Sequence, residues 1–141
     1  MKAWIFQAKP ERYEVKELQV NQHITWLVTR YREEMHKGDL VFLWRAGDRS
    51  ERGIYGWGCL IDETPNEIKD WGYGVGLEYR FKFKNFISVD ELEQNGVLTD
   101  NQILKMPIGT NFRLSHAEVE QLSQLIQKRG DAIPECDAGG V

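Results

Sequence analysis

The hydrophobic pattern is densest between Ile24 and Gly47, and the rest of the chain is interpreted around this stretch. Leu27, Tyr31 and Met35 recur every four residues, a spacing that predicts one inward face of a helix. Gly38 is typical of a helix end. The five apolar residues 40–44 then predict a strand that is buried on both faces. The stretch is therefore predicted to be a helix, a tight stop and a strand.

Other apolar runs predict a small sheet. Residues 3–7 form a first strand, and residues 40–44 and 54–61 form a hairpin across a polar turn. Gly56 and Gly58 indicate a bulge or a close backbone approach in the second hairpin strand. Residues 77–86 alternate between aromatic and basic side chains, which predicts a half-buried strand.

Helices are predicted around these strands. Residues 13–20 favour a short helical turn, Ser88 begins a capping box, and Ser115 begins a second one before a longer helix. Because strands and helices do not alternate regularly, the pattern favours an α+β fold, a small curved sheet or barrel of five to six strands with peripheral helices. Residues 1–130 form the predicted domain, and residues 131–141 a tail or linker stump.

Composition and charge bear on whether the protein spans a membrane, binds nucleic acid or contains a disulfide. The chain has 141 residues and a net charge of −4, and no apolar run reaches the ~20 residues that span a bilayer. Residues 1–60 hold ten Lys/Arg and eight Asp/Glu, whereas the remainder holds eight and fourteen, so a local basic surface is compatible with an acidic protein. Cys59 and Cys136 lie far apart in sequence. We therefore expect no disulfide, and a cytoplasmic location.

Motifs of catalysis are not found in the sequence. The three histidines and two cysteines lack the spacing of zinc ligands, and no nucleophile elbow or phosphate-binding loop is present. We therefore expect no metal, no cofactor and no enzymatic activity. Aromatic residues are abundant instead, including five tryptophans. Trp44 is followed directly by Arg45, and an aromatic face beside a guanidinium group suits a flat ring or a nucleotide.

Several segments, in their order and spacing, resemble the EVE domain, and most closely the EVE domains of modification-dependent restriction proteins. They are IFQAKPERY, TWLVTRYREEMHKGDLVFLWRAG, IYGWGCLI and MPIGTNF, within residues 3–127. The resemblance implies a PUA-like fold related to YTH domains. It also implies a reader that holds a flipped, modified base in an aromatic pocket, which agrees with the physics of extruded-base recognition.

The resemblance also implies site residues. Trp26 matches a tryptophan that begins a helix and walls the pocket, Trp71 falls where YTH domains place a second cage tryptophan, and Gln7 borders the pocket. Asn111 either meets a base edge or caps a turn. Many EVE proteins have Lys-Ser in place of Gln7-Ala8, so the bound base stays open.

The leading hypothesis is a reader of 5-methyl- or 5-hydroxymethylcytosine, or N6-methyladenine, in DNA, which directs a fused or associated nuclease. The alternatives are a PUA-type binder of modified RNA and a binder of a free aromatic ligand. Phosphate contacts would supply most of the affinity. The candidate cations for these contacts are Arg30, Arg32, Arg45, Arg49 and Lys82.

Overall fold

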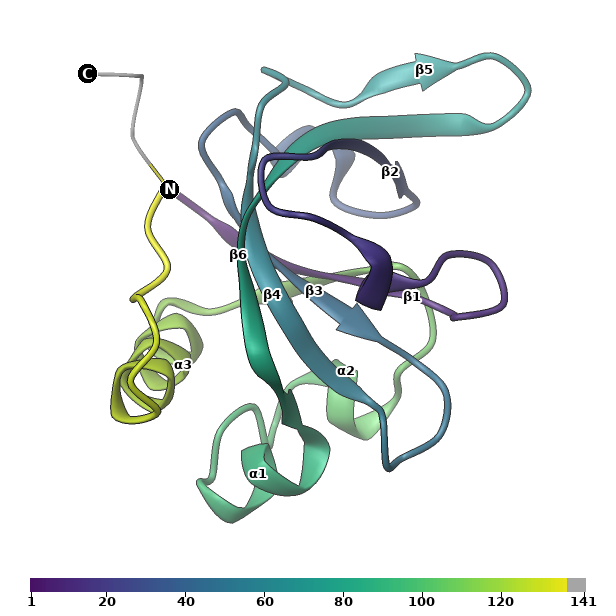
Figure 1. The fold of residues 1–141 in the computed structure, drawn as a ribbon. Coiled ribbons are helices and arrows are strands. Elements are labelled where there is room, and N and C mark those ends of the chain that lie inside the picture. The colour runs from purple at the N-terminus through teal and green to yellow at the C-terminus, as the bar shows by residue number, and fades with distance from the viewer. Residues whose placement is uncertain (137–141) are drawn as a thin grey trace.

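The computed structural model describes residues 1–136 and is organised around one curved, mixed sheet (Figure 1). Its strands are β1 (Ala3–Ala8), β2 (His23–Val28), β3 (Leu40–Arg45), β4 (Gly53–Leu60), β5 (Asn66–Ile68), β6 (Gly72–Ser88) and β7 (Asn111–Leu114). Its helices are η1 (Val15–Glu17), η2 (Arg32–Glu34), α1 (Val89–Gln94), α2 (Gln102–Lys105) and α3 (His116–Lys128).

The long strand β6 joins several other strands into the one sheet. The strand order is β2-β6-β4-β3-β1-β7, with β5 paired to β6, and only β1 and β3 run parallel. The long strand β6 pairs with β2, β4 and β5, and its register with β4 shifts at two places. The predicted α+β class, with a curved sheet and peripheral helices, is confirmed, and short β5 adds a seventh strand to the predicted five or six.

Glycines in β4 allow the tight contact with β6, as the sequence predicts. A Cβ on Gly56 would lie 2.1 Å from the Tyr79 hydroxyl, and one on Gly58 would lie 2.3 Å from a backbone oxygen of Glu78. Both contacts are shorter than van der Waals separation, so only glycine fits at these positions. The register shifts beside both residues show that β4 is bulged here.

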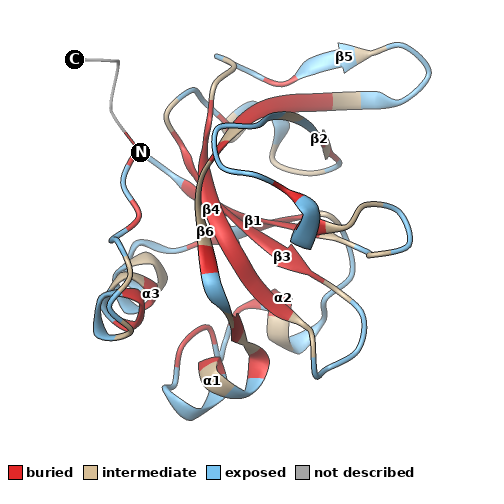
Figure 2. Cartoon of the chain, in the orientation of Figure 1, coloured by how far each residue is buried: buried red, intermediate tan, exposed pale blue. Residues whose placement is uncertain are grey.

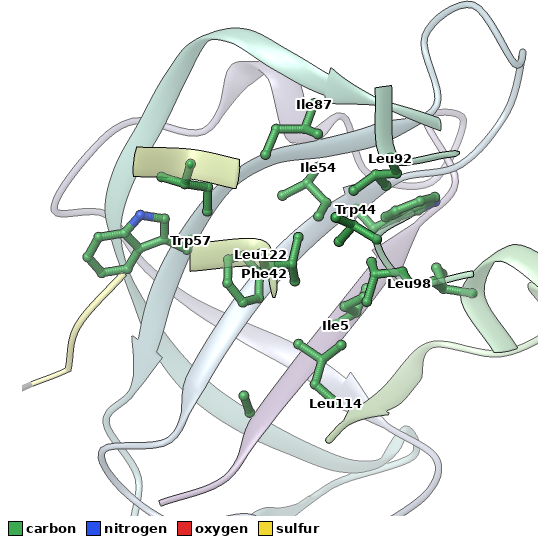
Figure 3. Packing of buried hydrophobic residues seen from close by; sticks show 14 of the residues in the cluster. Ile5, Phe42, Trp44, Ile54, Trp57, Ile87, Leu92, Leu98, Leu114 and Leu122 are labelled. Carbon is green, nitrogen blue, oxygen red and sulfur yellow. The ribbon is translucent and has the colours of Figure 1, made fainter. Parts of the chain in front are cut away.

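One face of the sheet is covered by α1, α2 and α3, and we call it the helix-covered face (Figures 1 and 3). Ile5, Phe42 and Trp44 of the strands pack there against Leu92 and Leu122 of the helices. The Ser88 and Ser115 side chains accept hydrogen bonds from backbone N–H groups three residues later, and the complete predicted capping box forms at Ser115. Most of β3 and β4 is buried, whereas β5 is largely exposed (Figure 2).

The opposite face carries Trp4, Phe6, Trp26 and Tyr79, and we call it the aromatic face. No α-helix of the described residues contributes to this cluster, which includes Val15 of η1 and strand β2.

The predicted helix between Ile24 and Gly38 is wrong. Residues 23–28 form strand β2, and only the single turn η2 follows. Ile24, Thr25 and Val28 are β-branched, which favours a strand, and pairing with β6 outweighs the four-residue spacing of apolar positions. Alternating burial confirms the strand, because Trp26 and Val28 are buried and Thr25 is exposed.

The predicted absence of a disulfide is also wrong, because Cys59 and Cys136 are joined. Residues 131–136 contain no helix or strand, yet Pro134 and Cys136 are buried, so the first part of the predicted tail lies against the domain. Sequence spacing did not indicate this contact, since the two cysteines are 77 positions apart. The remainder of the predicted tail, residues 137–141, lies outside the described residues, and the cytoplasmic location stays a prediction.

Candidate functional site

Trp26 lies inside β2 on the aromatic face and is only 6% exposed. Its ring stacks on Phe6 at a centroid distance of 6.0 Å, and the Tyr13 ring meets it edge-on at 5.5 Å. Trp26 therefore does not begin a helix, and its ring is packed between neighbours. Burial raises the pKa of the Tyr13 hydroxyl, and Glu17 acts in the same direction, so Tyr13 is protonated at neutral pH.

A pocket of about 400 Å³ opens where β2 ends. This volume is within the range of small-ligand sites, about 300–1,000 Å³. Val28 lies two residues after Trp26 in β2, so both side chains project from the same face of the strand. The pocket is lined by Val28, Thr29, Arg30, Tyr31, Arg32, Glu33, Glu34 and Tyr73.

Aromatic rings and guanidinium groups alternate around this pocket. The Arg32 guanidinium lies 3.8 Å from the centre of the Tyr73 ring, and the Arg30 guanidinium lies 5.6 Å from that of Tyr31. Both distances are within the range of cation–π attraction. The pocket thus offers aromatic faces and guanidinium donors to a ligand, beside the carboxylates of Glu33 and Glu34.

Tyr31 has a backbone conformation that bulky side chains rarely adopt. Its φ angle is 61°, in the left-handed region, and it directly precedes η2. The surrounding contacts hold it there: its ring lies 5.4 Å from that of Trp4, and the Arg113 guanidinium lies 5.9 Å from its centre. Strained residues of this kind are concentrated at functional sites.

Asn111 links two segments that lie far apart in the sequence. It is fully buried, its side-chain oxygen accepts a 2.8 Å hydrogen bond from the Thr29 N–H, and its amide donates to the Leu27 carbonyl at 3.0 Å. Because β2 and β7 are the two end strands of the sheet order, this amide links the ends of the curled sheet. The predicted contact between Asn111 and a base edge stays a prediction.

Gln7 is also occupied by the protein itself. Its side-chain amide donates to the carbonyls of Pro107 (3.1 Å) and Gly109 (2.8 Å), and only 8% of the residue is exposed. Gln7 thus ties the loop between α2 and β7 to the end of β1. The structure brings Gln7, Trp26 and Asn111 to one end of the sheet.

Trp71 and Trp44 occupy opposite extremes of exposure. Trp71 is 73% exposed in the turn between β5 and β6, where Asp70 and Gly72 both have positive φ angles. Trp71 precedes Tyr73 by two residues. The prediction that Trp71 and Trp26 face one cavity is wrong, because the Trp71 ring is exposed to solvent and the Trp26 ring is buried. Trp44 is fully buried on the helix-covered face, across the sheet from Trp26, so it lies outside this site.

A profile of the EVE domain matches residues 2–126 of the chain. The chain belongs to the EVE domain family. No curated protein sequence gives a significant match. The predicted family is therefore confirmed across nearly the whole described chain.

Solved structures share this EVE fold at low sequence identity. A protein from Agrobacterium tumefaciens aligns with a TM-score of 0.73 at 12% identity, covering 98% of this chain and 100% of the other. A hypothetical protein from Leishmania major gives 0.72 at 12% identity, covering 92% and 97%. Human THYN1, solved in complex with DNA containing 5-methylcytosine, gives 0.65 at 18% identity, covering 89% and 97%. These similarities confirm a PUA-like fold.

Only two of the five predicted phosphate ligands lie at the pocket of this EVE domain, Arg30 and Arg32. Arg45 is 8% exposed and its guanidinium donates to the Glu14 carboxylate at 2.9 Å, a bond that raises the pKa of Arg45. Arg49 pairs with Asp90 of α1 at 2.8 Å. The Lys82 ammonium donates to the backbone carbonyls of Lys16 and Leu18 at 2.7 and 3.0 Å.

Sequence reasoning missed the two tyrosines that line the pocket, Tyr31 and Tyr73, and also Tyr13, which packs on Trp26. The four-residue spacing places Tyr31 on the inward face of a helix, and the sequence analysis predicts neither β2 nor the start of β6, where Tyr73 lies. The alternation Trp71-x-Tyr73-x-Val75 was the available signal for the start of β6.

Two further features are absent from the described residues, a metal-binding cluster and a membrane-spanning helix. Within residues 1–136, no three His, Cys, Asp or Glu side chains gather where they could hold a metal ion. Among the same residues, no helix has the length and hydropathy needed to cross a membrane.

Proposed function

We propose that this EVE domain binds nucleic acid at the end of β2 and holds a modified base there. The single observation that carries the proposal is the pocket in which the Tyr31 and Tyr73 rings alternate with the Arg30 and Arg32 guanidinium groups. Rings provide stacking surfaces for a base, and guanidinium groups attract the phosphates that flank it. The fold shared with human THYN1, whose structure contains 5-methylcytosine DNA, supports the same assignment.

Trp71 has the freedom to stack on the bound base. It is exposed on a tight turn, and stacking on an exposed ring costs no core packing. We assign Trp26 a supporting role, because it is buried and its ring packs against Phe6 and Tyr13. In this proposal Asn111 positions the backbone at Thr29 of the pocket, and Gln7 positions the neighbouring loop at Gly109.

The proposed ligands are 5-methyl- or 5-hydroxymethylcytosine, or N6-methyladenine, flipped out of DNA. A methyl group on a base adds about 0.8 kcal/mol when an apolar wall covers it, so discrimination rests on a small contact and affinity on the phosphates. The domain would then direct a fused or associated nuclease to modified DNA. That last step rests on the sequence resemblance alone.

The test is binding to DNA and RNA oligonucleotides that differ only in one modified base, at several salt concentrations. We expect the tightest binding to one of the modified strands. Trp71→Ala should weaken that binding about tenfold, since one stacking ring contributes about 1–3 kcal/mol. The matched control is Ile133→Ala, which removes another exposed apolar side chain, 48% exposed, from the segment near Cys136.

The oligonucleotide series also distinguishes the alternatives. A preference for a modified RNA over its DNA counterpart would establish the RNA-binding alternative in place of DNA reading. Equal affinity for every modified and unmodified strand would contradict the proposed function.

A further inference from the structure

The loop between α2 and β7 presents apolar side chains to solvent beside the candidate site. Five consecutive residues, Lys105 to Gly109, are exposed, and two of them are large and apolar: Met106 is 61% exposed and Ile108 is 75% exposed. Pro107 stands between them and restricts the backbone. Contiguous exposed apolar surface with a polar rim is typical of contact surfaces, and here two large apolar side chains lie two residues apart.

The loop is held firmly in place. The Gln7 side chain donates to the carbonyls of Pro107 and Gly109, and the Gln7 backbone N–H donates to Thr110 at 2.8 Å. The Met106 N–H donates to the Gln102 carbonyl at 2.7 Å, at the end of α2. Hydrogen bonds at both ends therefore fix the loop backbone. The side chains of Met106 and Ile108 do not belong to either hydrophobic cluster.

The loop adjoins the pocket through Arg30, a residue that lines the pocket. A Cβ on Gly109 would lie 3.1 Å from the Arg30 guanidinium, and Arg30 also donates to the Asn111 carbonyl at 2.9 Å. Lys105, at the start of the loop, is exposed and pairs with Asp100 at 3.5 Å, a weak surface contact. Two cations thus flank the two apolar side chains, a combination that is complementary to stacked bases between phosphates.

We propose that Met106 and Ile108 form a wedge that enters the base stack of duplex DNA where the modified base has left it. The inference rests on the proposed function and adds to it the residues that replace the extruded base. Extruding a paired base costs a few kcal/mol of pairing and stacking. Inserted apolar side chains, among them isoleucine, methionine and proline, are a known way to offset such unstacking.

The test compares wild type with Met106→Ser/Ile108→Ser on two ligands that carry the same modified base. In one, the base is paired within a duplex; in the other, the same strand is unpaired. The double variant should bind the paired duplex at least tenfold more weakly and the single strand as wild type does, because only the duplex requires extrusion. Ile133→Ser is the matched control, and it should bind both ligands as wild type does.

A 2-aminopurine placed beside the modified base gives a second readout. Its fluorescence should rise when wild type unstacks the duplex and should stay low with the double variant. Equal loss on duplex and single strand, or no loss on either, would overturn the wedge. The proposed function is judged separately, by whether wild type prefers the modified over the unmodified strand in the same assay.

Discussion

The helix-covered face and the aromatic face of the sheet differ in their tyrosines. All five tyrosines of the chain belong to the cluster on the aromatic face, and none belongs to the other. A phenol group needs water or a hydrogen-bond partner. The helix-covered face, closed by α1, α2, α3 and the residues up to Cys136, is built almost wholly from side chains without such a group.

We infer from this difference that the helix-covered face mainly supports stability and that the aromatic face carries the proposed binding site. The helix-covered face buries large apolar side chains and carries the disulfide, as expected of a region that holds the fold together. On the aromatic face, Tyr13, Tyr31 and Tyr73 stay partly exposed, and Tyr31 and Tyr73 line the pocket. The following predictions test that separation, beginning with the largest effect.

Trp44→Ala should lower the free energy of unfolding by about 3–5 kcal/mol, because it empties a fully buried position on the helix-covered face. Trp71→Ala, at an exposed position, should change it by less than about 0.5 kcal/mol. Urea unfolding measures both. Trp44→Phe is the milder control, since the indole nitrogen of Trp44 has no hydrogen-bond partner among the described residues. Equal destabilisation by the two alanine variants would contradict the separation.

Reduction of the Cys59–Cys136 disulfide should lower the free energy of unfolding by about 2–4 kcal/mol, the usual range for a crosslink. Urea unfolding with and without a reducing agent measures the loss. The variant Cys59→Ala/Cys136→Ala provides the control, because it should be indifferent to the reducing agent. An unchanged wild-type midpoint under reduction would show that the crosslink does not stabilise the domain.

The sequence predicts the helix-covered face better than the aromatic face, for a physical reason. Its strands and the capped helices follow from local signals, such as the apolar run 40–44 and the serine caps at Ser88 and Ser115. The aromatic face depends on β2, whose strand conformation comes from pairing with β6, a contact about fifty residues away in sequence. Long-range pairing can override a competing local pattern, as it does in β2.

The candidate site shows the same limit. The resemblance directed attention to Trp26 and Trp71, and both lie on or near β2 and β6. It could not show that Arg45 is paired with Glu14, or that Asn111 links the ends of the sheet, because these roles depend on partners that the fold supplies. A basic residue cannot be assigned to phosphate binding from sequence alone when its carboxylate partner lies close in space but far away in the chain, as Glu14 does from Arg45.

Above pH 10 the domain should lose stability through its buried tyrosines. Burial raises the pKa of Tyr79 well above the ordinary value of 10.0, so the unfolded chain releases the phenol proton while the folded chain still holds it. The free energy of unfolding is therefore unaffected by this group below pH 10 and falls above it by about 1.4 kcal/mol per pH unit. Urea unfolding across pH 8–11 measures the slope, and Tyr79→Phe should make it shallower. An identical slope in the variant would remove Tyr79 as its source.

The smallest expected effect concerns the salt dependence of binding. Arg32→Ala should make the plot of log affinity against log salt shallower by about one unit, the loss expected for one phosphate contact. Arg49→Ala should leave the slope unchanged, because Arg49 is paired with Asp90 of α1 on the other side of the sheet. Equal changes in both variants would show that phosphate contacts are not confined to the pocket.

The most direct test of the account is to map which backbone amides change when a duplex with one modified base is added, by NMR chemical shifts on the intact chain. We predict that the changes gather at residues 28–34, 71–75 and 105–109, around the pocket and the proposed wedge. The amides of α1 and α3 should stay unchanged. Changes centred on α1 or α3 would place the ligand on the helix-covered face and contradict the account.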